Sequence, residues 1–282
     1  MKLRYTTADD FLINISSDDA LFHYTGRAIV FEEILHKNCF LLFTFKNTND
    51  PLEYKDRLID AVGWGWENKS DNIVFEITNT IDFIIKEKTH FASFCKNKFN
   101  NDTLESHGFL KPRMWSQYGE SHKGLCLVFS KNKVIQAINK EIENTKHLFF
   151  HDSVKYCEYV HDSTHTTLHA DANLLNNKTP HEIAIEHINK CYRDLFFIKQ
   201  NDFEREDEYR FIICDTNEIL TEKKIYKFDA LNCLIGIIAG DRFHKAHYPI
   251  IKDLIQKNKI VCRKLHWEKG EYFLFSQDHF FG

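Results

Sequence analysis

The sequence predicts an α+β fold in which one mixed domain spans residues 1–282. Segments of strand character and segments of helix character alternate irregularly along the chain, with no internal repeat and no linker rich in proline and glycine. The composition supplies a large core, because the chain has 25 Phe, 11 Tyr and 4 Trp but only 10 Gly and 4 Pro. No glycine pattern of a Rossmann or P-loop site is present, so neither of those phosphate sites is indicated.

Hydrophobic periodicity places the elements of the first half of the chain. Continuous apolar runs of four to eight residues indicate strands, and apolar residues three to four positions apart indicate helices. For the helix over 26–38 the expected inward side chains are Ala28, Ile29, Phe31, Ile34 and Leu35. We expect strands over 21–25, 39–45, 91–96 and 125–130, and helices over 26–38, 51–62, 73–88 and, ending in a turn, 112–124.

The second half contains one strong helix signal. Thr179 as N-cap, Pro180 at the first helical position and Glu182 three residues after the cap form a capping box in front of an amphipathic stripe. Residues 131–178 predict only a helix, a strand around 153–160 and a polar loop, so a helical or loop insertion is expected near 131–200. Beyond it we expect strands over 206–214, 223–228, 233–240, 260–267 and 272–276, and a helix over 243–257.

Charge and cysteine usage bound the environment of the protein. A formal net charge of −4 argues against a dominant nucleic-acid or anionic-membrane surface. The chain has no apolar run of signal-peptide or membrane-spanning length, so we expect a cytoplasmic protein without a membrane partner. The eight cysteines are widely spaced and lie mostly beside apolar residues, which predicts small buried side chains in a reducing compartment.

The segment NDFEREDEYRFIIC, residues 201–214, carries the clearest functional signal. Six charged side chains lie between Phe203 and Phe211, and the chain then becomes apolar on both faces. In a strand, Glu206, Glu208 and Arg210 share one face, so two carboxylates and a guanidinium would meet at the rim of the sheet. The alternative is a solvated helix turn in which Glu206 and Arg210 form an ion pair worth about 0.3–0.5 kcal/mol.

Short motifs in a fixed order resemble the bacterial domain of unknown function 2971 family. The resemblance covers nearly the whole chain and rests on FHYT (22–25), NDPLEY (49–54), FASFC (91–95), MWSQYGESHKGLCLVF (114–129), EREDEYRFI (204–212) and LIGIIAG (234–240). It implies no activity by itself. It does join the polar residues His23, Tyr24, Thr25, Asn49, Asp50, Glu53, Trp115, Tyr118, His122, Glu206, Glu208 and Arg210 into one candidate set.

The opening segment HYTGRAIVFEEILHKNCFL is similar to the start of ADP-ribosyltransferase folds, although Asn38 stands where a helix-ending glycine is usual. This resemblance implies a split-sheet core and NAD as the substrate. It assigns His23, with Tyr24 and Thr25 on the same strand, to the ribose or adenosine side. The catalytic residues it implies are Glu208 as charge stabiliser, Glu206 as the residue that orients the acceptor, and Tyr118 or Trp115 as the stacking ring.

By the same resemblance, Arg210 would fix the carboxylates or meet the pyrophosphate. Each assignment has a structural alternative: His23 as a core histidine, Trp115 as packing, Tyr118 as a helix end. Asn49 and Asp50 are first of all turn formers.

The expected function is therefore an NAD-consuming transferase or glycohydrolase, in a toxin or phage-defence setting. Its partners would be a nucleotide and a protein or nucleic-acid acceptor, and the sequence leaves a homo-oligomer open. The alternatives are a nuclease or phosphodiesterase that holds Mg²⁺ with Asp50, Glu206 and Glu208, and a nucleotide sensor without turnover. His161, His165 and His169 have the spacing of zinc ligands on a helix, but the Ser/Thr-rich context favours a loop, so no metal ligand is assigned.

Overall fold

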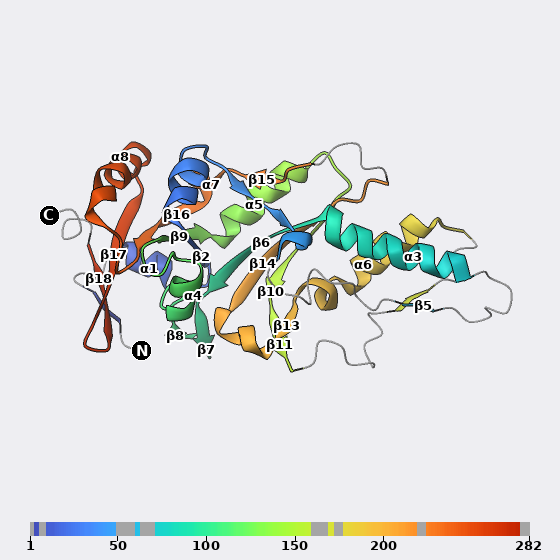
Figure 1. Cartoon of the computed structure of the whole chain (residues 1–282), viewed down its shortest axis with the longest axis horizontal. Helices are drawn as coiled ribbons and strands as arrows, with labels where there is room; N and C mark the ends of the chain where they lie inside the picture. Colours follow the sequence, from blue (N-terminus) through green and yellow to red (C-terminus); the bar gives the residue numbers. More distant parts are fainter. Residues whose placement is uncertain are drawn as a thin grey trace.

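The computed structural model describes residues 3–5, 10–48, 60–62, 71–158, 169–171, 177–218 and 224–276. A ten-stranded, mostly antiparallel sheet runs through the molecule (Figure 1), so the chain has the α+β fold that the sequence predicts. In order across the sheet the strands are β1 (Leu3–Tyr5), β18 (Glu271–Phe275), β17 (Val261–Glu268), β16 (Leu234–Ala239), β9 (Leu125–Ser130), β2 (Ala20–Thr25), β6 (Thr89–Lys96), β14 (Glu208–Cys214) and β10 (Leu148–Ser153), with β4 (Phe43–Thr44) beside β6.

Helices and short strand pairs surround this sheet. None of the helices in the described ranges is both long and apolar enough to cross a membrane. The helices are α1 (Asp10–Ile15), η1 (Ile29–Leu35), η2 (Phe45–Asn47), α3 (Asp71–Phe83), η4 (Ile84–Lys88), α4 (Pro112–Gln117), α5 (Lys131–Ile142), α6 (Pro180–Phe196), η7 (Asn201–Glu206), α7 (Ala230–Cys233), η8 (Lys245–His247) and α8 (Tyr248–Asn258). The short pairs are β3 (Phe40–Leu41) with β15 (Lys227–Phe228), β5 (Asp60–Val62) with β12 (His169–Asp171), β7 (Lys98–Asn100) with β8 (Thr103–Ser106), and β11 (Lys155–Cys157) with β13 (Ile198–Gln200).

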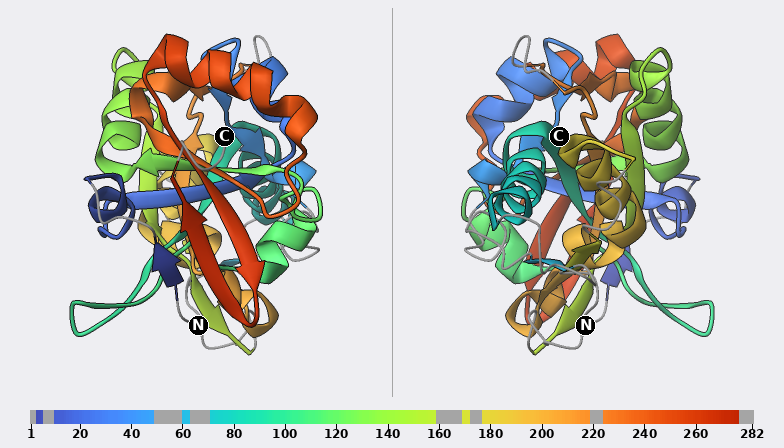
Figure 2. Two further views of the ribbon diagram at one scale, coloured as in Figure 1. Left: turned by 90° about the vertical axis from the view of Figure 1, so that its left-hand side faces the viewer. Right: turned by 90° about the vertical axis from the view of Figure 1, so that its right-hand side faces the viewer.

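The two faces of the sheet bury different cores. Along β9, Leu125 and Leu127 enter a core shared with η1, α5, α7 and α8, while Cys126 and Val128 enter a second core shared with α1 and α4. Along β14, Ile212 faces a third core that α3 and α6 cover. Because side chains alternate along a strand, the second and third cores lie on the same face of the sheet. Figures 1 and 2 show α3 and α6 side by side at one end of the molecule and α4 nearer the other.

Most predicted elements are confirmed, including the capping box, in which Thr179 accepts from the Glu182 amide and Glu182 from the Thr179 amide. Three expectations are wrong. The run 39–45 divides into two-residue strands, and Asp60–Val62, the predicted end of a helix, is a strand. The stripe expected in 26–38 is also shifted: Ile29 is 53% exposed and Val30 is buried.

A wider helical turn explains the shifted stripe. Residues 29–35 form a π-helix, whose turn is longer than the 3.6 residues on which the prediction rested. Val30, Ile34 and Leu35 therefore face inward together. The chain leaves this helix through Asn38, which has a left-handed backbone (φ 50°) and whose Oδ1 accepts from the Leu231 amide. Asn38 thus occupies the conformation for which a glycine is usual.

The cysteines lie mostly in the core. All eight cysteines carry free thiols, and six are buried as predicted, while Cys39 and Cys157 are half-buried.

Between α4 and β9, three consecutive residues that are not glycine have left-handed backbones: Glu120 (φ 52°), Ser121 (φ 54°) and His122 (φ 71°). The Glu120 carboxylate forms an ion pair with Arg27 (2.6 Å), and the His122 carbonyl accepts from the Arg242 amide (3.0 Å). Contacts on both sides thus hold a turn that costs about 1–2 kcal/mol per left-handed residue.

This turn yields a stability prediction. Ser121→Gly should stabilise the protein by about 0.5–1 kcal/mol, because glycine removes the left-handed penalty but adds unfolded-state entropy. The control is Ser116→Gly in α4, at an exposed position in a right-handed helix, which should destabilise by about 0.5 kcal/mol. Urea denaturation of both variants measures the two shifts. Destabilisation by Ser121→Gly would contradict the left-handed turn.

Candidate functional site

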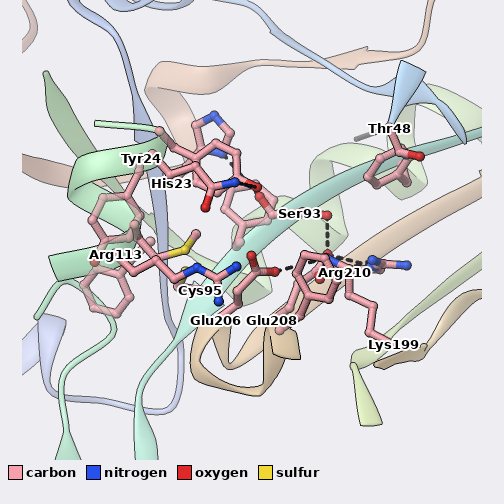
Figure 3. A pocket seen from close by; sticks show the side chains of 17 residues that line it. His23, Tyr24, Thr48, Ser93, Cys95, Arg113, Lys199, Glu206, Glu208 and Arg210 are labelled. Atoms are coloured by element: carbon pink, nitrogen blue, oxygen red, sulfur yellow. Dashed lines mark hydrogen bonds and ion pairs between the residues drawn. The ribbon is translucent and has the colours of Figure 1, made fainter. Parts of the chain in front are cut away.

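A cavity of about 470 Å³ opens on the sheet face that carries the second and third cores, at the place where neither covers it. Its floor is formed by β6 and β14, and its walls by β2, α4, β13 and η7. On β6, Phe91 belongs to one core and Cys95 to the other, and Ser93 between them faces the cavity. Polar side chains therefore line the floor of an otherwise apolar face (Figure 3).

Glu208 is the centre of a buried ion network. Its Oε1 accepts from Arg210 Nε (2.6 Å) and from Ser93 Oγ (2.5 Å). Its Oε2 lies 3.1 Å from Arg210 Nη2 and 3.0 Å from Lys199 Nζ. Burial raises the pKa of Glu208, but Arg210, Lys199 and the Ser93 hydrogen bond outweigh burial and lower it to about 2. Glu208 is therefore ionised, and both of its oxygens are fully engaged.

Arg210 is held as firmly as its partner. Only 1% of the residue is exposed, Nη1 donates to the Phe196 carbonyl (2.8 Å), and the guanidinium lies beside the stacked rings of Phe45 and Phe91. Of the three residues predicted to share one strand face, Glu208 and Arg210 do so, whereas Glu206 precedes the strand. The Glu208–Arg210 contact is buried, so the solvated helix turn of the alternative interpretation is wrong. The charged start of this strand is thus neutralised within the site.

Glu206 lines the same cavity as Glu208 but has one carboxylate oxygen without a hydrogen-bond partner in the described structure. It ends η7 rather than beginning the strand, because Asp207 has a left-handed backbone (φ 45°), yet it lines the same cavity. Its Oε2 accepts from Lys199 Nζ (3.0 Å), whereas its buried Oε1 has no hydrogen-bond partner in the part of the chain that the structure describes. Burial and the nearby Glu208 raise the pKa of Glu206, against the opposing effect of Lys199.

Cations from α4 and the loop before it hold η7 over the cavity. Lys111 Nζ contacts the Arg205 carbonyl (3.1 Å) and the Asp207 carboxylate, on either side of Glu206. Arg113 Nη1 donates to the Asp202 carbonyl (2.8 Å), and its guanidinium faces the Phe203 ring at 5.8 Å. Among the described residues, no carboxylate lies within ion-pair distance of Arg113.

His23 lies beside the cavity, at the point where the sheet divides. β2 pairs with β6 only at Leu21 and Phe22, and the strands then separate, while β2 stays paired with β9 up to Thr25. The His23 ring packs against Phe40 and Phe94 of the opposite core, and its Nδ1 lies 3.2 Å from the Ser93 carbonyl. A carbonyl only accepts, so Nδ1 carries the proton and Nε2 is an acceptor. Burial lowers the pKa of His23 to about 4, so the ring is neutral at pH 7.

His23, Tyr118 and Glu208 all line one cavity, as predicted, but the His23 ring packs in the opposite core and bonds a carbonyl, as the core-histidine alternative held. Tyr118 lies at the rim and is 36% exposed. Tyr24 also lines the cavity, but its hydroxyl donates to the Gly108 carbonyl (2.7 Å). The cavity thus has an accessible tyrosine and an anchored one.

Two predicted ligand contacts do not line this cavity. Trp115 is fully buried and its indole N–H donates to the Phe109 carbonyl (2.8 Å), so it packs in the core, as the alternative interpretation held. Thr25 is buried at the end of β2. Asn49, Asp50, Glu53, His161 and His165 lie outside the described residues, as does the side chain of His169, whose backbone belongs to β12.

Among the lining residues that sequence reasoning did not find are Ser93, Arg113, Lys199 and Phe203. The family-like motif FASFC contains Ser93, but a serine inside an apolar strand gave no reason to single it out. Lys199 follows a helix in a segment whose strand pairing could not be predicted. Within the described ranges, no group of three or more His, Cys, Asp or Glu is placed to hold a metal ion.

Comparison with known proteins confirms the family resemblance over part of the chain. The family described as "Protein of unknown function (DUF2971)" matches residues 114–211. This segment begins in α4 and ends in β14, and so contains Tyr118, Lys199, Glu206, Glu208 and Arg210. No curated protein and no solved structure matches the chain.

The two carboxylates should differ sharply in their effect on stability. Glu208→Gln leaves Arg210 and Lys199 buried beside a neutral partner and should cost about 3–5 kcal/mol at pH 7. Glu206→Gln should be neutral or stabilising at pH 7, because the raised pKa of Glu206 means that folding disfavours its charged form. Denaturant midpoints of both variants measure the difference.

The pH dependence gives the control for this comparison. The pKa of Glu208 is about 2 in the folded protein and about 4.5 ordinarily. Its charge therefore stabilises the folded state fully above about pH 4.5, and this stabilisation is lost as the pH falls towards 2. The difference in stability between wild type and Glu208→Gln should therefore decrease over that range. A gap that stays constant would show that Glu208 acts through packing rather than charge.

Proposed function

We propose that the cavity is the active site of an enzyme that breaks the nicotinamide–ribose bond of NAD, as an ADP-ribosyltransferase or an NAD glycohydrolase. The observation that carries the proposal is the buried Glu206 carboxylate, whose Oε1 has no partner among the described residues and which lines an aromatic cavity. A desolvated carboxylate with a free oxygen is suited to stabilise a positive charge that develops on a sugar.

The reaction needs one carboxylate in two roles. When the bond from ribose C1′ to the nicotinamide nitrogen breaks, its electron pair leaves with nicotinamide, and positive charge forms on the sugar. Glu206 would stabilise that charge. Water or an acceptor group would then bond to C1′ and give its proton to Glu206, whose raised pKa makes it the better base of the two.

This division of roles exchanges the assignments that the sequence suggested. Glu208 was the expected charge stabiliser because it lies further along the strand, but the two residues are equally buried, at 4% exposure each. Glu208 already binds Arg210, Ser93 and Lys199. We therefore assign Glu208 a positioning role, through Lys199, which contacts both carboxylates at 3.0 Å.

Other lining groups suit the remaining parts of NAD. The Tyr118 ring at the rim would stack on nicotinamide. We propose no ribose contact for His23, because its ring packs against Phe40 and Phe94 on the opposite face of the sheet. Arg113, without a carboxylate partner in the described ranges, would meet a phosphate. The separation of β2 from β6 after Phe22 supports a split sheet of ADP-ribosyltransferase type.

The magnesium-dependent nuclease is less well supported. Its proposed ligands Glu206 and Glu208 share Lys199 Nζ, so a cation already lies between the two carboxylates. Ligation of Mg²⁺ by both would require Lys199 to withdraw. An enzyme that consumes NAD would lower the NAD concentration of its host cell, and on this basis we propose a toxin or defence effector. Its acceptor would be a protein or a nucleic acid.

The main test is nicotinamide release from NAD by the purified protein. Glu206→Gln should lower the rate by about 100-fold or more, the usual contribution of a positioned acid or base. Glu204→Gln is a matched control, because Glu204 is exposed on the same short helix η7. Absence of nicotinamide release by wild type with water, protein and nucleic-acid acceptors would overturn the proposal. Strand cleavage that requires Mg²⁺ would favour the nuclease, and NAD binding without turnover would favour the sensor.

A second prediction concerns Tyr118. If its ring stacks on nicotinamide, Tyr118→Phe should retain nicotinamide release, whereas Tyr118→Ala should raise KM for NAD roughly tenfold through the loss of the stacked face. Steady-state kinetics of both variants provide the comparison. Equal loss in Phe and Ala variants would instead assign the function to the hydroxyl.

A further inference from the structure

A second recess lies on the opposite face of the sheet from the candidate active site. Its volume is about 710 Å³, and it runs between α5 and the segment from β15 to α7, beside the chain that links η1 to β3. Helix α5 and α7 belong to the core on the face away from Glu208. The recess therefore shares no lining residue with the carboxylate cavity. We call it the lysine groove, defined by Lys37, Lys133, Lys140 and Lys227.

Unneutralised cations distinguish this groove. Lys133 and Lys140 stand seven positions apart on one side of α5, and Lys227 faces them from β15. In the part of the chain that the structure describes, none of these three ammonium groups has an ion-pair partner. Only Lys37 has one, the Glu33 carboxylate at 2.5 Å.

The acids of the groove do not cancel this charge. The Asp229 carboxylate caps α7, since Oδ1 accepts from the Asn232 amide (3.1 Å) and Oδ2 from Asn232 Nδ2 (2.5 Å). Glu141 is the other acid along the wall. In a chain of net charge −4, a concave surface with this excess of lysine concentrates anions.

The floor of the groove is apolar and rigid. Phe228 is buried and stacks on Phe40 with ring centroids 4.9 Å apart. Cys233 and Ala137 complete the floor. An apolar floor below a cationic rim matches a ligand with a flat ring system and several phosphates, and the volume is within the range of small-molecule sites.

We propose that the lysine groove is a second binding site, for a nucleotide that carries a chain of phosphates. The lysines bind the phosphates as mobile point charges, and the ring system lies over the floor to which Ala137, Phe228 and Cys233 contribute. The net charge of −4 argues against an extended nucleic-acid surface, so the groove suits a free nucleotide rather than the continuous backbone of a nucleic acid.

Calorimetric titration with adenosine, AMP, ADP and ATP tests the proposal. Affinity should rise with each phosphate and fall as salt is added. The variant Lys133→Gln/Lys140→Gln/Lys227→Gln should weaken ATP binding at least tenfold, since a charge-assisted contact contributes about tenfold. The control Lys190→Gln/Lys252→Gln/Lys257→Gln removes the same charge from exposed positions on α6 and α8 and should leave the affinity unchanged.

Three results would overturn the proposal. Equal weakening in both triple variants would show that net charge alone attracts ATP. Unchanged binding in the groove variant, together with loss in Arg113→Gln, would place the nucleotide in the carboxylate cavity. Binding that strengthens with the length of an RNA or DNA oligonucleotide would identify a nucleic-acid surface instead. None of these readouts depends on nicotinamide release, so the groove and the proposed NAD reaction can fail separately.

Discussion

The buried contact between Glu208 and Arg210 is the constraint on which the arrangement of the site depends. Both residues lie on one strand, two positions apart, on a sheet face that is apolar on either side of them. Neither charge could stay there without the other. Lys199 and Ser93 complete the network from β13 and β6, so three strands are brought together by one carboxylate. The cavity is the space left where this network replaces apolar packing.

The network also determines which groups remain available for chemistry. Both oxygens of Glu208 accept from its partners, and Arg210 contacts two stacked aromatic rings and a carbonyl. Glu206 reaches the same cavity from a different element and keeps one oxygen unused within the described structure. A carboxylate with both oxygens engaged and one with an unpartnered oxygen can therefore stand two residues apart, because the left-handed Asp207 separates the helix from the strand.

Local pattern was enough to predict much of this fold. Capping at Thr179 and the apolar runs of β6, β9 and β14 follow from side-chain chemistry within a few residues. The same pattern placed Glu208 and Arg210 on one face. It could not reveal the π-turn that rotates Val30 inward, nor the partner Lys199, since both depend on packing between distant segments. The burial of Trp115 was likewise decided by tertiary contacts.

One edge of the sheet imposes an order of assembly. β1, residues 3–5, pairs in parallel with β18, residues 271–275. β1 is synthesised first but can pair only after β18, one of the last strands, has been made. All described residues that line the carboxylate cavity lie between Phe22 and Arg210. During synthesis, the residues of the site emerge well before the edge can close. A chain that ended before β18 would hold every described lining residue, but β1 would have no partner and β17 would become an exposed edge, the kind of edge at which chains aggregate.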